Sequence, residues 1–127
     1  MHKLSPHFKR AEFSCQGASC CWHSSPVNER LIKALEGLRI LLQAPITITS
    51  GFRCNRHNTN IGGAADSYHT LGMAADIKVQ GYSPAGIAAL AEDIPDFRAG
   101  GIGIYSGWVH LDVRTSGAAR WDKRTAK

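Results

Sequence analysis

The sequence predicts an α+β fold, in which helices pack to one side of a small, mainly antiparallel sheet. Residues 25–43 carry apolar side chains at helical spacing, residues 75–79 alternate between polar and apolar, and residues 101–114 form two strand-like runs around a Ser-Gly turn. The chain has 127 residues, of which 43% are hydrophobic and 20% are charged. This length and composition predict one domain that spans residues 1–127.

The two ends of the chain are expected to be the least regular parts. Residues 1–25 are rich in Ser, Gly, Cys and Pro from position 5 onward, which predicts an irregular N-terminal wrap without regular secondary structure. The basic tail over residues 122–127 is expected to be disordered.

The first clear element is a helix over residues 25–43, SPVNERLIKALEGLRILLQ. Ser25 can serve as the N-cap and Pro26 suits the first turn, while Pro45 is expected to end the helix. The apolar positions that recur at helical spacing are expected in the core: Val27, Leu31, Leu35, Leu38 and Leu42.

The remaining elements alternate between strands, a loop and one further helix. A strand over 46–49 runs to the Ser50-Gly51 turn, and a polar loop over 55–66 follows. The next elements are a strand over 75–79 and a helix over 83–94 that starts with Ser-Pro. The last is a hairpin in which 101–105 pairs with 108–114. In the second strand Asp76 and Lys78 share one face, and Ile77 and Val79 share the other.

Four cysteines are present, at positions 15, 20, 21 and 54. Their spacing matches neither a C-x-x-C pair nor a zinc ribbon, so a structural zinc knuckle is not expected. One disulfide between the 15–21 cluster and Cys54 is a candidate, and free thiols are the alternative that the sequence leaves open.

A net charge of +5 favours an anionic partner such as nucleic acid, a membrane surface or a cell-wall polymer. No stretch interleaves Lys or Arg with aromatic residues, so direct nucleic-acid binding is the less favoured hypothesis. The apolar runs are shorter than the roughly 20 residues that cross a bilayer. The start, MHKLSPHFKR, lacks the apolar segment of a secretory signal, so we expect a chain made in the cytoplasm without a leader. We also expect a monomer.

Three polar residues form a candidate metal site. A hydrolytic zinc site takes three protein ligands and leaves one position for water, and imidazole nitrogens with one carboxylate oxygen suit zinc. His69, Asp76 and His110 would supply this set. Gly72 permits the tight path that must bring His69 back toward Asp76.

The last strand carries a second indication. Alternation places His110 and Asp112 on one face of an otherwise apolar strand, which requires a chemical reason. A lone histidine in a strand is more often hydrogen-bonded structure than a ligand. From these residues alone, both interpretations stay open.

Four separated segments resemble one enzyme family. SYHTLGMAAD (67–76) matches the pattern S-x-H-x-x-G-x-A-x-D of the zinc D-Ala-D-Ala carboxypeptidase and peptidoglycan endopeptidase family, and residues 101–114 look like its closing hairpin. Residues 4–15 resemble its N-terminal segment, and residues 48–58 resemble the strand and turn that carry its arginine. The resemblance extends over most of the chain, is closest to short, often phage-borne members, and implies the fold shared with lysostaphin-type enzymes and the hedgehog signalling domain.

The resemblance implies roles for individual residues. His69, Asp76 and His110 would be the zinc ligands, and Arg53 would face the substrate carboxylate or the polarised carbonyl and stabilise the oxyanion. Asp112 would orient a ligand histidine. In isolation, a surface ion pair would be the preferred interpretation of Arg53, and a simple surface carboxylate is the alternative for Asp112.

Two more residues are candidates for the substrate side of the site. Ser67 would lie at the rim, although a hydroxyl bonded to its own backbone is an equal alternative. Trp108 could stack on a glycan or peptide, or it could be a packed aromatic residue.

The chain departs from the family pattern at the general base. Several members carry Glu or Asp three residues before the last histidine ligand, where this chain has Gly107, and others carry a histidine where this chain has Tyr105. Tyr105 could donate a hydrogen bond to the tetrahedral intermediate, but a phenol is a poor base near neutral pH.

The resemblance implies a zinc metallopeptidase that cleaves a peptide bond in bacterial peptidoglycan, as a D-Ala-D-Ala carboxypeptidase or an endopeptidase of endolysin type. Its partners would be peptidoglycan stem peptides and its cofactor Zn²⁺. It would act at the cell wall or in the periplasm, after release by a phage or as part of a virion. The alternative is a non-catalytic, zinc-containing module for wall binding or phage assembly.

Overall fold

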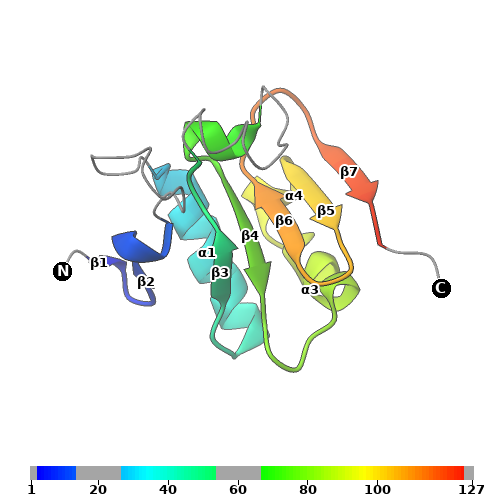
Figure 1. Ribbon diagram of the computed structural model, residues 1–127, viewed down its shortest axis with the longest axis horizontal. Coiled ribbons are helices and arrows are strands. Elements are labelled where there is room, and N and C mark those ends of the chain that lie inside the picture. The colour runs from blue at the N-terminus through cyan, green and yellow to red at the C-terminus, as the bar shows by residue number, and fades with distance from the viewer. Residues whose placement is uncertain (1–2, 14–26, 54–66, 125–127) are drawn as a thin grey trace.

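The computed structural model describes residues 3–13, 27–53 and 67–124. It is an α+β fold whose five-stranded sheet has the order β3-β4-β6-β5-β7, with the helices on one face (Figure 1). The strands of this sheet are β3 (Thr47–Ser50), β4 (Ala74–Lys78), β5 (Gly101–Ile104), β6 (Val109–Asp112) and β7 (Ala119–Asp122). β7 pairs with β5 in parallel and the other pairs are antiparallel, so the predicted mainly antiparallel α+β fold is confirmed.

Three helices cover the core face of the sheet: α1 (Glu29–Leu42), α3 (Pro84–Ala91) and α4 (Pro95–Arg98). The predicted core positions Leu31, Leu35, Leu38 and Leu42 are all buried, and Val27 packs against the core just before α1. No described helix is long and apolar enough to span a membrane.

Helix α1 begins and ends differently from the prediction. Asn28, not Ser25, is the N-cap, because the Asn28 side chain accepts a hydrogen bond from the backbone N–H of Arg30. Ser25 and Pro26 lie outside the described residues. The helix ends before Pro45, since Gln43 adopts a left-handed conformation at φ 54° and its N–H donates to the carbonyl of Arg39.

The second predicted helix is shorter than residues 83–94. Ser83 caps α3 by accepting a hydrogen bond from Gly86, and Pro84 is in the first turn, as expected. The helix ends at Ala91, and Pro95 starts the separate short helix α4, because proline is favoured in a first turn and disfavoured within a helix.

The described part of the N-terminal segment, residues 3–13, has regular structure, contrary to the irregular wrap expected there. β1 (Lys3–Ser5) and β2 (Phe8–Lys9) form a hairpin, followed by the 3-10 turn η1 (Arg10–Phe13). Phe8 and Phe13 are fully buried, with ring centroids 6.0 Å apart, and this apolar anchor organises the segment. The Phe13 carbonyl accepts the N–H of Phe52, which holds the end of β3 in place.

Three further expectations from the sequence concern residues that lie partly or wholly outside those that the structure describes. The cysteine pairing, the polar loop over 55–66 and the last residues of the tail all fall there. The predicted tail nevertheless begins too early, because Asp122 belongs to β7, a strand that the sequence analysis did not predict.

Candidate metal centre

The face of the sheet opposite the helices, which we call the site face, carries the polar residues of interest. Asp76 lies at the middle of β4, and its neighbours Ala75 and Ile77 point into the core. The register of β4 with β6 places Asp76 directly opposite His110. Both side chains are buried, at 6% and 8% exposure, so the predicted alternation along each strand is confirmed.

His69 reaches the site from the 3-10 turn η2 (Tyr68–Leu71), which lies at one end of the sheet (Figure 1). The Ser67 hydroxyl caps this turn by accepting the His69 N–H at 3.1 Å. Gly72 ends the turn at φ 72°, a conformation in which a residue with a Cβ is strained. This local geometry turns His69 back toward β4, as the sequence predicted for Gly72.

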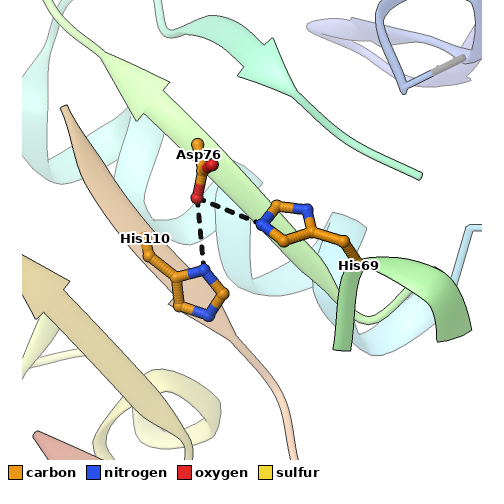
Figure 2. A group of neighbouring side chains, drawn as sticks. All are labelled: His69, Asp76 and His110. Atoms are coloured by element: carbon orange, nitrogen blue, oxygen red, sulfur yellow. Dashed lines mark hydrogen bonds and ion pairs between the residues drawn. The ribbon is translucent and has the colours of Figure 1, made fainter. Parts of the chain in front are cut away.

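His69, Asp76 and His110 converge at one point (Figure 2). His69 Nε2 and His110 Nδ1 each lie 3.2 Å from the same oxygen, Asp76 Oδ1. Two ligands bound tetrahedrally to zinc at about 2.0–2.2 Å are about 3.4 Å apart, so these separations suit a metal ion shared by the three atoms.

The other nitrogen of each histidine already has an acceptor. His69 Nδ1 lies 2.7 Å from the Gly51 carbonyl, and His110 Nε2 lies 2.7 Å from Asp112 Oδ2. Because a carbonyl and a carboxylate can only accept, these nitrogens carry the protons of the neutral rings. In the neutral rings the lone pairs of His69 Nε2 and His110 Nδ1 would point at the Asp76 carboxylate, so either a metal ion or an added proton on the ring must lie between each nitrogen and the carboxylate.

Asp112 is fully buried and accepts hydrogen bonds from several directions. Its oxygens receive the N–H of Gly101 at 2.9 Å, and both Nε and Nη2 of Arg114 at 2.9 and 2.8 Å. Asp112 is therefore not a surface carboxylate, and it contacts His110 in the way that an orienting residue would. Arg114, partly exposed, thus contacts the buried Asp112, which in turn contacts the ring that carries the proposed ligand atom.

The electrostatics of the metal-free site favour a cation. Burial alone would raise the pKa of Asp76, but the hydrogen bonds and charges of His110 and His69 outweigh burial and hold the pKa well below its usual range. Burial lowers the pKa of His110, yet its hydrogen bonds to Asp112 and Asp76 give a net rise. Asp76 is thus ionised at neutral pH, and a proton on His110 competes with a metal.

Arg53 lies beside the three residues, with its side chain 15% exposed. Its Nη2 is 3.2 Å from Asp76 Oδ2, the oxygen that faces away from the two histidines, and its Nε donates to Ser50 Oγ. The guanidinium thus holds the Asp76 carboxylate in place. Arg53 is thus next to a candidate ligand, and its oxyanion role stays a prediction.

Ser67 makes a contact within its own turn, whereas Tyr105 and Trp108 contact each other. The Ser67 hydroxyl bonds the backbone of its own turn, which was the alternative to a rim position. Tyr105 and Trp108 stack on each other, with ring centroids 4.6 Å apart and an interplanar angle of 7°. Trp108 is 36% exposed, so one part of its ring is packed and another is accessible.

Comparison with known proteins now gives this geometry a family. Residues 6–112 match Peptidase M15. The chain belongs to the Peptidase M15 family. It is 35% identical over 94 residues to the peptidoglycan L,D-endopeptidase MepK of Escherichia coli K12, a match that covers 68% of this chain and 48% of MepK. It is 46% identical over 48 residues to the zinc D-Ala-D-Ala carboxypeptidase of Streptomyces albus G, which covers 38% of this chain and 18% of that enzyme.

This M15 chain spans about half the length of the curated MepK sequences that it matches. Two histidine nitrogens and a carboxylate oxygen also form a donor set suited to zinc, and the predicted cofactor agrees with a zinc carboxypeptidase among the relatives. The resemblance to this family, predicted from four motifs, is confirmed.

Trp121, outside the matched residues, is the site neighbour that sequence reasoning missed. Its ring lies 5.1 Å from the His110 ring, and its Nε1 donates to the Tyr105 hydroxyl at 2.9 Å. Arg114 lies between Trp121 and Tyr68, with its guanidinium carbon 5.5 and 4.4 Å from the two ring centroids. The alternation of small or apolar with charged residues in ARWD (119–122) could have indicated this strand, but a run of four residues before a basic tail is too short to be recognised as one.

Proposed function

We propose that the chain is a zinc-dependent peptidase that hydrolyses a peptide bond in bacterial peptidoglycan. The observation that carries the proposal is the convergence of His69 Nε2 and His110 Nδ1 on Asp76 Oδ1, with the opposite nitrogen of each histidine already bonded to an acceptor. Two relatives whose names specify peptidoglycan or D-Ala-D-Ala peptidase activity support the substrate class.

His69, Asp76 and His110 would hold the metal, which supplies an activated water and polarises a carbonyl. Arg53 would stabilise negative charge that develops on the carbonyl oxygen, because it is a fixed cation beside Asp76. Asp112 would keep the His110 ring oriented, and Tyr105 would lie on the same face of the sheet as a hydrogen-bond donor. Ser67 and Trp108 are proposed to contact the substrate at the edges of the site.

The proposal is tested by metal analysis together with digestion of purified sacculi. Wild type should contain one zinc per chain and release new amino groups from sacculi, and a chelator should abolish this activity until zinc is restored. His110→Ala should lose both zinc and activity. His7→Ala is the matched control, because His7 lies on the N-terminal hairpin and pairs with Glu36. Full activity of His110→Ala would refute the proposal.

A second candidate function is a non-catalytic, zinc-containing module that binds the cell wall. The observation that favours it is Gly107, which has no side chain at the position where several family members carry a carboxylate base. Protein that retains zinc and stays bound to sacculi, without any new amino groups over time, would select this function.

The bond that is cleaved distinguishes the two kinds of peptidase named by the relatives. A carboxypeptidase releases single D-Ala residues, whereas an endopeptidase of the endolysin type releases larger fragments or opens cross-links. We favour an endopeptidase acting at the wall, because the longer match is to an endopeptidase. Masses of the fragments released from sacculi decide between the two.

A further inference from the structure

The site face continues beyond the metal centre as a second row of side chains. On β4, Lys78 follows Asp76 by two residues and therefore points to the same face. Thr47 pairs with Lys78 across β3 and β4, and the β4–β6 register places Trp108 next to Lys78 on the other side. Two residues of strand correspond to about 6.5–7 Å, so this row lies about two extended substrate residues away from the metal centre.

A cavity of about 370 Å³ opens at this row. Its lining includes Thr47, Lys78, Tyr82, Gly107 and Trp108, with apolar side chains beneath them. A Cβ at Gly107 would meet no atom within 4 Å, so the cavity is open at that side. The cavity is not lined by the three candidate ligands, but Lys78 at its edge is two residues along β4 from Asp76.

Charge specifies what the cavity would bind. Lys78 is the one charged side chain among the described residues that line it, and in the described part of the chain no carboxylate lies within ion-pair distance of Lys78. Trp108 and Tyr82, both exposed at about the same level, add apolar and aromatic surface beside this cation. A ligand with a carboxylate on a short aliphatic stem fits both features.

We propose that this cavity is a substrate subsite in which Lys78 binds a free carboxylate of the peptidoglycan stem peptide, with the adjoining aliphatic carbons against Trp108. The inference rests on the proposed function, because it deepens the specificity of the same site. An extended peptide whose scissile carbonyl lies at the metal centre advances about 3.3 Å per residue. The bound carboxylate therefore belongs to a residue about two positions from the scissile bond.

The test compares two peptides and two lysine variants. One peptide is a stem-type tetrapeptide with free carboxylates, and the other is the same peptide with its internal carboxylates amidated. Lys78→Met removes the proposed cation. Lys33→Met makes the same change in charge on α1, where Lys33 is exposed and lies on the helical side of the sheet. Binding of each peptide is measured by calorimetry, and cleavage is measured by KM and kcat.

We expect Lys78→Met to weaken binding of the free-acid peptide about 5-fold and to raise KM by the same factor with kcat unchanged, a size typical of a partly exposed charge pair. The amidated peptide should bind wild type and Lys78→Met equally, and the difference for the free acid should shrink as salt is added. Lys33→Met should match wild type in every measurement.

Failure of the subsite and failure of the peptidase proposal give different results. Equal binding of the free-acid peptide by Lys78→Met and Lys33→Met, in a preparation whose wild type digests sacculi, overturns the subsite and leaves the peptidase function intact. Binding of the free-acid peptide that depends on Lys78, without any cleavage by wild type, supports the subsite and overturns the peptidase function.

Discussion

Trp121 rests directly on the backbone of Gly103, because a Cβ at Gly103 would lie 2.3 Å from Cε2 and Nε1 of the indole. Gly103 is the strand partner of His110, so the indole crosses β5 and meets the His110 ring from that side. The glycine is needed for this close approach. The contact links β7, which lies beyond the family match, to the proposed metal ligand.

Gly103→Ala should displace Trp121 and destabilise the fold by about 1–3 kcal/mol, the usual cost of overpacking. Urea unfolding monitored by tryptophan fluorescence measures this loss. Gly107→Ala is the matched control, because its Cβ would meet no atom within 4 Å. Equal stability of the two variants would show that the indole does not occupy this position in solution.

Trp121→Phe should separate the two contacts of the indole. The phenyl ring keeps packing beside His110 but cannot donate to the Tyr105 hydroxyl, whereas Trp121→Ala loses both interactions. We expect zinc affinity to be close to wild type in Trp121→Phe and to fall severalfold in Trp121→Ala. Competition with a fluorescent chelator measures the affinities, and identical values for the two variants would assign no orienting role to the ring.

Asp112→Asn should lower zinc affinity by about 10–100-fold, the range seen when the acceptor behind a ligand histidine is altered. The variant keeps the shape of the side chain but loses the negative charge that receives His110 Nε2 and the Arg114 guanidinium. The same chelator competition measures the effect. Asp122→Asn alters an exposed carboxylate that pairs with Arg124 and should leave affinity unchanged.

Arg53→Met should retain zinc but reduce kcat about 10²–10³-fold, since it removes the cation proposed to stabilise the oxyanion. Arg53→Lys should recover part of this loss, because the charge returns without the planar guanidinium. Arg39→Met, on the helical side, is the control for the change in net charge. Wild-type turnover by Arg53→Met would restrict Arg53 to its ion pair with Asp76.

Glu36 should contribute stability that depends on pH. Burial raises its pKa, but hydrogen bonds from Ser5 and His7 outweigh burial and lower the pKa in the folded protein. A lowered folded pKa gives stability that is fully present above the unfolded value, about 4.3, and is lost as pH falls through the folded value. Glu36→Gln should therefore lower the melting temperature at pH 7 and converge with wild type at acidic pH.

The size of the Glu36 effect is expected to be about 1–2 kcal/mol at pH 7, as for hydrogen bonds to a charged group. Thermal unfolding by circular dichroism between pH 2 and pH 8 measures it. Asp93→Asn changes an exposed carboxylate and should follow the wild-type curve. A constant difference between Glu36→Gln and wild type across this range would contradict the titration.

By itself the sequence determined the class of fold, the core of α1, the central strands and the three candidate ligands. Periodic apolar residues report burial directly, whereas His69, Asp76 and His110 were implied as ligands by the resemblance of their motifs to the peptidase family. Only the tertiary structure decided which nitrogen of each histidine faces Asp76, because that choice depends on the Gly51 carbonyl, 18 residues before His69, and on how Asp112 is held within β6.

The formation of the N-terminal hairpin and of β7 was also decided by the tertiary structure. Their residues have weak local preferences, and they become ordered by contacts with distant parts of the chain: Phe13 against the end of β3, and Trp121 against Gly103. Such contacts leave no period in the sequence. The ligands could therefore be predicted from the resemblance of their motifs to a family, whereas the surroundings that orient them required the assembled sheet.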